Sequence, residues 1–359
     1  MTIFHSLKIA DVIRETEDAI SVEFEVPEDL ASDYSFTQGQ HLTLKTDVDG
    51  EELRRSYSIC SAVGDANLRV AIKQINGGKF STFANENLKS GASLDVMVPQ
   101  GRFFTPLSPD NHKSYLMVAA GSGITPIFSI IKTILQTEHQ SSVTLVYGNR
   151  TTSSVLFLEQ LEDLKNIYGE RLNLLHILSR EQQDSEIFNG RIDTQKCTDL
   201  FDGPLATDRF DDAFLCGPEQ MIMDVQDFLQ SKGLAKDHIH FELFITDASI
   251  AASKHTHKED DMKPSGPKHK VSVIIDGRKS EVTIPEKGVS ILDAALATDI
   301  DLPFACKGGV CCTCRAKVIQ GKVRMDLNYA LEDDEVEQGY VLTCQSHPLT
   351  DDVIVDYDV

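Results

Sequence analysis

The spacing of five cysteines near the C-terminal end constrains this chain more than any other sequence feature. Cys306, Cys311 and Cys314 follow the pattern C-x4-C-x2-C, and Cys344 comes later in the segment VLTC. In plant-type iron–sulfur proteins this spacing brings four thiolates together around the two irons of a [2Fe-2S] cluster. The glycines between the first two cysteines let backbone N–H groups approach the sulfurs. The spacing therefore predicts Cys306, Cys311, Cys314 and Cys344 as cluster ligands.

Two alternatives stay open at this loop. A structural zinc site usually shows two C-x2-C pairs, whereas this loop has one pair preceded by C-x4. Cys312 lies between two predicted ligands, and we interpret it as a nonligand, with ligand exchange onto it as the alternative. Disulfides are rare in the reducing cytosol, so clustered cysteines in a cytosolic chain favour a metal site.

The length of the chain indicates its number of domains, and its charge limits the kinds of partner it can bind. The 359 residues predict two or three domains. The 56 acidic and 34 basic side chains give a net charge of -22, which argues against binding to nucleic acid or to an anionic membrane surface. The sequence contains no signal-like apolar segment at its start and no run of about 20 apolar residues. We therefore expect a cytoplasmic protein that uses neither nucleic acid nor membrane as a partner.

The first part of the chain predicts an antiparallel β-barrel over residues 1–108. Short strand-like runs alternate with turns there, in the order SLKIADVI, ISVEFEV, HLTLKTDV, RRSYSIC, LRVAIKQI and SLDVMV. Few helical stretches interrupt these runs, as expected of an all-β domain.

The rhythm then changes to strand followed by helix over residues 109–245. Strand-like SYLMVAA, VTLVYG, LNLLHILS, AFLCG and HIHFELF alternate with helical patterns, which predicts a doubly wound parallel α/β sheet. The first helix repeats isoleucine and leucine at i, i+3, i+4, i+7 and i+8 from Ile127 to Leu135, and we assign this face to the core.

Residues 246–268 predict a flexible linker, because they are small, charged and without periodicity. His255 and His257 fall within it, and we interpret them as solvated rather than metal-binding. Residues 269–359 combine a hairpin, a short helix and the cysteine loop, which predicts a small α+β domain built around a cofactor.

Two segments have the chemistry of a flavin site. Tyr57 could stack on the flavin ring, Ser58 could hydrogen-bond to it, and the fork of Arg55 suits a phosphate. The glycines Gly77 and Gly78 then open a helix whose N-terminus is suited to an anion. A tyrosine on a strand is more often simple packing, so the order of these segments before a nucleotide domain carries the interpretation.

A nicotinamide nucleotide is predicted at the ends of the parallel strands. Gly121 and Gly123 form a G-x-G-x-x-P turn that opens a helix, which differs from the G-x-G-x-x-G fingerprint of dinucleotide folds. Open α/β sheets bind ligands at such strand ends. Three residues at later strand ends could hold a 2′-phosphate and favour NADPH over NADH: Arg150, Ser179 and Arg180. Cys216 could line the nicotinamide pocket or be a small buried hydrophobe.

Taken together, these motifs resemble the ferredoxin-NADP reductase superfamily fused to a plant-type ferredoxin of β-grasp fold. The segments GQHLTLK, RRSYSIC, GGKFSTF, PQGRFF, AAGSGITPI, YGNR, CGPEQM, HFELF and CKGGVCCTC carry the resemblance nearly end to end. Within the superfamily the chain resembles the reductase components of phenylacetyl-CoA epoxidases. The resemblance implies FAD as the flavin and an oxygenase component as the partner that accepts electrons from the ferredoxin domain.

The resemblance also implies specific site residues. FAD would contact Arg55, Tyr57, Ser58, Ile72, Lys73, Gly77, Gly78, Ser81 and Thr82. The nucleotide, NADPH or NADH, would contact Gly121, Gly123, Thr125, Arg150, Ser179, Arg180, Cys216, Gly217 and Met221, with Phe244 near the flavin. Tyr57, Ser58, Cys216 and Glu242 would act directly in hydride transfer.

These sites together predict an electron path from NADPH through FAD and the cluster to a di-iron oxygenase of phenylacetate degradation. A flavin takes up two electrons with a hydride and can release them singly. In one alternative function, the same electron path serves a Rieske-type steroid or aromatic-ring hydroxylase. In a second alternative, the chain is an electron carrier that never oxidises nucleotide. The GSGITP and CGPEQM segments argue against this alternative. The acidic run from Leu331 to Glu337 is interpreted as a solvated turn, with a docking face as the alternative.

Overall fold

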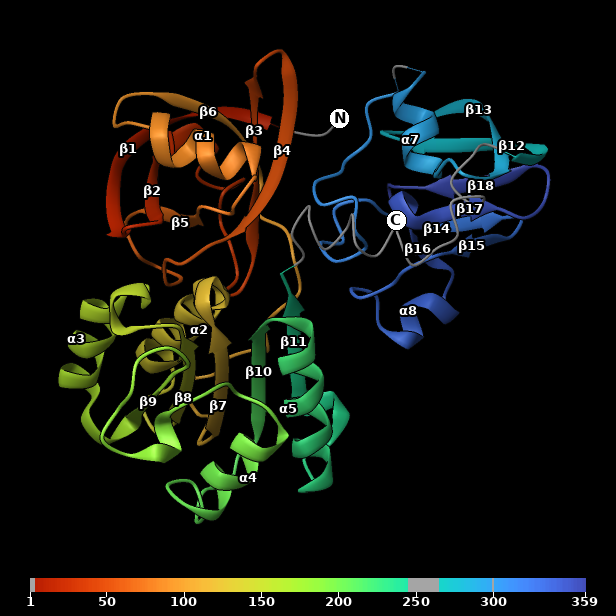
Figure 1. Cartoon of the computed structure of the whole chain (residues 1–359). Coiled ribbons are helices and arrows are strands. Elements are labelled where there is room, and N and C mark those ends of the chain that lie inside the picture. Colours follow the sequence, from red (N-terminus) through yellow and green to blue (C-terminus); the bar gives the residue numbers. More distant parts are fainter. Residues whose placement is uncertain (1–3, 245–264, 299) are drawn as a thin grey trace.

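The computed structural model describes residues 4–244, 265–298 and 300–359. Three large sheets succeed one another along the described chain, and buried side chains pack against each of them (Figure 1). In the described part of the chain, no helix combines the length and apolarity needed to cross a membrane.

The first sheet is the predicted antiparallel barrel. Its strands are β1 (Phe4–Thr16), β2 (Ala19–Glu25), β3 (His41–Val48), β4 (Glu51–Ser58), β5 (Leu68–Lys73) and β6 (Ser93–Met97), in the order β4-β3-β6-β1-β2-β5. An antiparallel bridge between Ile59 and Val70 joins the two edges. Side chains such as Leu42, Leu44 and Ile72 fill the interior, and helix α1 (Lys79–Asn87) follows β5. Because full closure removes exposed strand edges, the barrel can hold β4 as a fixed platform.

The second sheet is the predicted doubly wound sheet, and all its neighbouring strands are parallel. It contains β7 (Ser114–Ala120), β8 (Ser142–Asn149), β9 (Leu172–Leu178), β10 (Asp212–Gly217) and β11 (Ile239–Leu243), in the order β11-β10-β7-β8-β9. Helices α2 (Ile124–Thr137) and α3 (Leu158–Tyr168) pack on one face. Helices α4 (Thr194–Asp202) and α5 (Glu219–Ser231) cover the other.

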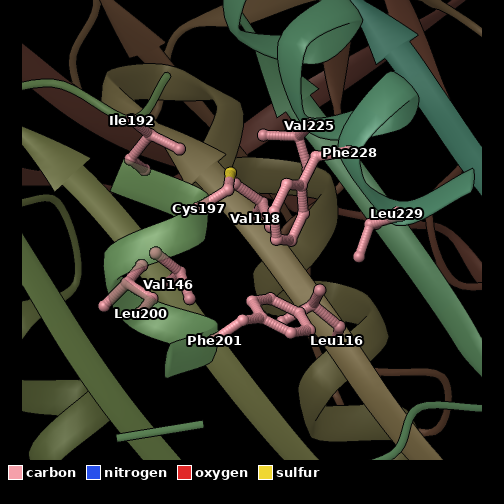
Figure 2. A pocket seen from close by; sticks show the side chains of 10 residues that line it. All are labelled: Leu116, Val118, Val146, Ile192, Cys197, Leu200, Phe201, Val225, Phe228 and Leu229. Carbon is pink, nitrogen blue, oxygen red and sulfur yellow. The ribbon is translucent and has the colours of Figure 1, made fainter. Parts of the chain in front are cut away.

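The isoleucine face of α2 lies in the core as predicted. Ile127, Ile131, Ile134 and Leu135 are fully buried. On the face of the sheet opposite α2, a cavity of about 10 Å³ lies between α4, α5 and the strands (Figure 2). Only apolar side chains and the thiol of Cys197 line it, so it offers a ligand neither room nor polar partners. Helix α4 was not predicted. Its apolar side chains pack against the sheet and α5, so they belong to the core and not to a binding site.

The third unit has the mixed sheet expected of a β-grasp domain. Its sheet contains β12 (Ser265–Ile275), β13 (Arg278–Lys287), β14 (Arg315–Gln320), β16 (Tyr340–Leu342) and β18 (Val353–Asp356), in the order β13-β12-β18-β14-β16. A second small sheet pairs β15 (Val323–Met325) with β17 (Ser346–Pro348). Helix α7 (Ile291–Leu296) packs beside them, with Ser290 accepting a cap hydrogen bond, and α8 (Asp333–Glu337) follows. Strand β12 begins at Ser265, inside the predicted linker, and both linker histidines lie outside the described residues.

A buried histidine makes the barrel sensitive to acid. Burial lowers the pKa of His41 from 6.5 to about 4. Below pH 6.5 His41 becomes protonated in the unfolded chain, whereas in the folded barrel it stays neutral down to about pH 4. The free energy of unfolding therefore falls as the pH drops from 6.5 to 4. Between pH 7.5 and pH 5 we expect a loss of about 2 kcal/mol in the free energy of unfolding. Urea unfolding followed by circular dichroism at the two pH values measures it, and His41→Gln should flatten the difference. Parallel pH dependences of the two proteins would contradict the assignment.

Candidate functional site

The turn after β7 and the end of β10 are in direct contact. A Cβ atom added at Gly123 would lie 2.2 Å from the carbonyl oxygen of Cys216. One added at Gly217 would lie 2.6 Å from the Met221 side chain. The 3-10 turn Gly121–Gly123 leads into α2, and no side chain caps this turn, so the N–H groups at its start can receive a phosphate. The hydroxyl of the buried Thr125 donates to the carbonyl of Ser122 at 3.1 Å, so it stabilises the turn.

The predicted arginine pair comes together at the ends of β8 and β9. The backbone N–H of Arg180 donates to the carbonyl of Arg150 at 2.8 Å, and that of Ser179 donates to Asn149 at 2.9 Å. The side chains of Arg150, Ser179 and Arg180 are exposed. Two guanidinium groups on adjacent strand ends form a place where an added phosphate can be bound through charge-assisted hydrogen bonds.

The end of β4 meets the end of β11. Ser58 donates a hydrogen bond from Oγ to Oε2 of Glu242 at 3.3 Å, although the two residues are 184 positions apart. Glu242 pairs in register with Cys216 of β10. Burial raises the pKa of Glu242 to about 8; the nearby Cys311 adds to the effect, and the Ser58 hydrogen bond opposes it. The four residues predicted to act in hydride transfer therefore come from strand ends that meet, with Tyr57 beside Ser58.

The turn before α1 suits the phosphates of a flavin nucleotide. Gly77 has a φ of +76°, and a Cβ on Gly78 would lie 2.6 Å from Oγ of Ser81. No side chain caps α1. The buried Ser81 hydroxyl instead accepts from the N–H of Ile75 at 3.1 Å, so it fixes the turn. The free helix N-terminus and the glycine turn fit a pyrophosphate.

Other predicted flavin residues lie around this turn. The ring of Tyr57 packs 5.6 Å from that of Phe80, which leaves it half-buried. Arg55 is half-buried on β4 and donates to the carbonyl of Arg54 at 2.8 Å.

The remaining residues predicted to contact the flavin make packing, ion-pair or hydrogen-bond contacts within the protein itself. Ile72 is fully buried in the barrel core, and its carbonyl oxygen accepts a hydrogen bond from the Asn85 side chain at 3.1 Å. Lys73 forms an ion pair with Asp18 at 3.5 Å. Thr82 accepts a hydrogen bond from Gln74 at 3.3 Å, and Phe244 packs against the core of the parallel sheet.

The four predicted cluster ligands form two pairs of thiols in contact, Cys306 with Cys311 and Cys314 with Cys344. A hydrogen bond with Cys311 lowers the pKa of Cys306 to about 7, and Cys314 is in hydrogen-bond contact with Cys344. Among the described residues, no three His, Cys, Asp or Glu side chains gather around one point. Two pairs of thiols fit the two irons of a [2Fe-2S] cluster better than the single ion of a zinc site.

Two non-glycine residues of the cluster loop adopt the left-handed backbone conformation, which is uncommon for residues other than glycine. Lys307 and Cys312 adopt positive φ values of 51° and 53°. The N–H of Gly308 donates to the sulfur of Cys306 at 3.3 Å, as a cluster ligand requires. The Cys312 thiol instead donates to the carbonyl of Ala330 at 3.2 Å, and burial raises its pKa to about 12. This placement favours Cys312 as a nonligand.

The three sites adjoin one another, because Glu242 lies within electrostatic reach of Cys311. The side of the loop that faces the parallel sheet carries Val310, and Val310 and Tyr329 pack against the core beside α5. On the barrel side, the guanidinium of Arg54 stacks 4.4 Å from the ring of Phe304. Arg54 belongs to the RRSYSIC segment, but its contact with Phe304 was not predicted, because the two residues are far apart in the sequence.

The acidic run was interpreted as a solvated turn, and this interpretation is wrong for Glu335. That residue is 6% exposed, and its carboxylate contacts Arg102 of the barrel and Arg315. The reason is that α8 lies where the ferredoxin sheet meets the rest of the chain. The exposed Asp333 in the same run pairs with Lys236 at 3.1 Å.

Three family models match the chain in order. Residues 6–105 match the oxidoreductase FAD-binding domain, residues 117–227 the oxidoreductase NAD-binding domain, and residues 273–349 the 2Fe-2S iron-sulfur cluster binding domain.

Curated relatives match from end to end. A subunit of the 1,2-phenylacetyl-CoA epoxidase from Escherichia coli is 48% identical over 358 residues, covering 100% of this chain and 99% of the relative. The ferredoxin reductase component of 3-ketosteroid-9-alpha-monooxygenase from Mycolicibacterium smegmatis is 34% identical over 357 residues, covering 98% and 96%. The solved structure of phthalate dioxygenase reductase superposes with a TM-score of 0.60 at 23% identity and covers 98% of each chain.

Proposed function

The chain belongs to those members of the ferredoxin-NADP reductase superfamily that carry a fused [2Fe-2S] ferredoxin, and from that premise we propose that it supplies electrons from NADPH to a phenylacetyl-CoA epoxidase. Its general role as an oxygenase reductase with FAD, a nicotinamide nucleotide and a [2Fe-2S] cluster follows from the family. The finer assignments of coenzyme, site residues and partner are our proposal. Outside the cluster loop, Cys60, Cys197 and Cys216 are buried free thiols, which supports a reducing cytoplasm as the place of action.

The contact between Ser58 and Glu242 beside Cys311 carries the proposal. When bound, FAD accepts a hydride and releases electrons one at a time, which matches a two-electron donor to a one-electron cluster. Tyr57 and Arg55 would hold the flavin, while Gly121 and Gly123 would let the nucleotide phosphates approach α2.

Glu242 and Ser58 would orient the reacting rings. Burial keeps the Glu242 carboxyl largely neutral at pH 7, since its pKa lies at about 8. A neutral carboxyl at this position avoids placing a buried negative charge beside the flavin and the cluster thiolates. Cys216, which is fully buried, would complete the wall of the nicotinamide site.

The partner is tested with two purified oxygenases. The reductase should support product formation by a phenylacetyl-CoA epoxidase and reduce a Rieske-type steroid hydroxylase at least about tenfold more slowly. The likeness to a ketosteroid monooxygenase reductase makes the second oxygenase the relevant rival. Equal or faster reduction of the Rieske enzyme would overturn the choice of partner and leave the electron path intact.

We predict that Arg150 and Arg180 select NADPH. Arg150→Ala with Arg180→Ala should raise the KM for NADPH by roughly 10- to 100-fold, because each guanidinium loses a charge-assisted bond to the 2′-phosphate. The KM for NADH, which lacks this phosphate, should change less than about twofold. Steady-state ferricyanide reduction with each coenzyme measures both values. Arg209→Ala is the matched control, since within residues 4–244, 265–298 and 300–359 the exposed Arg209 side chain donates only to the backbone carbonyl of its neighbour Asp208. Equal effects on both coenzymes would contradict the assignment.

A further inference from the structure

Oppositely charged side chains meet where the ferredoxin unit contacts the rest of the chain. Lys236 and Asp333 lie 3.1 Å apart, Arg54 and Asp301 lie 3.7 Å apart, and Arg102 contacts Glu335. In these three pairs the basic member belongs to the barrel unit or the parallel-sheet unit, and the acidic member belongs to the ferredoxin unit, drawn from cyan to blue in Figure 1. Such complementarity fixes the register of two surfaces more than it adds affinity.

Glu335 differs from the other acidic members because it is buried. Its side chain is 8% exposed, whereas those of Asp333 and Asp301 are 89% and 61% exposed. Exposed ion pairs contribute little, but a buried carboxylate that loses a partner is strongly unfavourable. Its second oxygen accepts the N–H of Glu332 at 3.2 Å, so α8 holds the side chain in place.

The carboxylate of Glu335 joins the barrel to the cluster loop. On one side lies Arg102, two residues beyond Gln100, whose backbone pairs with His41 through hydrogen bonds of 2.8 and 3.0 Å. His41 is in turn the β3 partner of Ser58. The barrel end of the bridge is therefore fixed to the strand end that carries the flavin-site serine.

The other side of the bridge reaches the cluster ligands. Nε of Arg315 lies 3.2 Å from Oε1 of Glu335, and Arg315 directly follows Cys314. The guanidinium of Arg315 also lies 3.5 Å from the ring centroid of Tyr340. The chain of contacts thus runs from Ser58 to Cys314 through one buried carboxylate.

We propose that Glu335 is a positioning residue for electron transfer, because its bridge between Arg102 and Arg315 holds the cluster loop against the flavin strand. This role rests on the proposed electron path and adds the residue that fixes its geometry. One electron passes from reduced flavin to oxidised cluster, and no other reactant is required. The rate of such a step depends steeply on separation, so a looser ferredoxin unit slows it without altering hydride uptake.

The first test measures shape and needs no activity. Arg102→Glu places a carboxylate against Glu335, while Arg102 itself is 55% exposed and its loss leaves no cavity. A compact chain of this length has a radius of gyration of about 21 Å. Small-angle scattering should give a value near this for the native protein and a clearly larger one for Arg102→Glu. Arg102→Lys should restore the compact value, and Arg209→Glu, the same charge change elsewhere, should leave it unchanged.

The second test separates positioning from stability. In anaerobic stopped-flow mixing with NADPH, Arg102→Glu should slow cluster reduction about tenfold or more while flavin reduction keeps its native rate. Circular dichroism and the bound iron should match the native protein. A native radius together with a native second phase in Arg102→Glu would overturn the proposal. If the native protein itself failed to reduce its cluster with NADPH, the proposed electron path would fall instead.

Discussion

Cys306→Ser should abolish electron delivery to the oxygenase while leaving oxidation of NADPH by the flavin intact. In the proposed site two thiol pairs would hold the two irons, so losing one thiolate should empty the site and lower bound iron from about two per chain to near zero. Epoxidase turnover should fall by about 100-fold or more, because no one-electron exit remains. Ferricyanide, which can accept electrons from the flavin directly, should still be reduced at the native rate.

Cys312→Ser is the matched control in the same loop. Its thiol already donates to the Ala330 carbonyl at 3.2 Å, so iron content and turnover should stay near native. If Cys306→Ser retained iron, combining it with Cys312→Ser would show whether Cys312 had become a ligand. Full iron and turnover in that double variant would contradict the assignment of Cys306.

Gly123→Ala should block hydride transfer from the nucleotide while flavin and cluster stay bound. The new methyl would lie 2.2 Å from the Cys216 carbonyl oxygen, so α2 or the end of β10 must move. A displacement of about 1 Å at a hydride-transfer site costs on the order of 100-fold in rate. The rate of flavin bleaching by NADPH measures the effect.

Gly148→Ala is the control for this change. Its methyl would lie 3.1 Å from Cδ1 of Ile192, which is the flexible end of a side chain. Flavin reduction in Gly148→Ala should stay within about threefold of native. Native rates in Gly123→Ala would contradict the placement of the nucleotide at this turn.

The sequence predicted those features that depend on local chemistry. The cysteine spacing, the apolar face of α2 and the alternation of strand and helix each follow from residues close in the chain, and the fold confirms the three predicted architectures. Helix α4 was not predicted, because TQKCTDLFD has few apolar residues and its periodic face is short.

Contacts between distant segments could not be read from spacing. Ser58 and Glu242 are 184 positions apart, and Arg102 and Glu335 are 233 apart. The first pair was expected only through resemblance to a family, and the second was missed. An acidic run on a surface helix has the same composition whether it faces solvent or a neighbouring domain, so burial of Glu335 had no local signal.

Anaerobic stopped-flow mixing of the purified protein with NADPH tests the electron path most directly. The flavin absorbance should bleach first and the cluster absorbance second, and Cys306→Ser should retain only the first phase. Cluster bleaching ahead of the flavin, or a flavin that NADPH leaves oxidised, would contradict the path proposed from Ser58, Glu242 and the paired thiols.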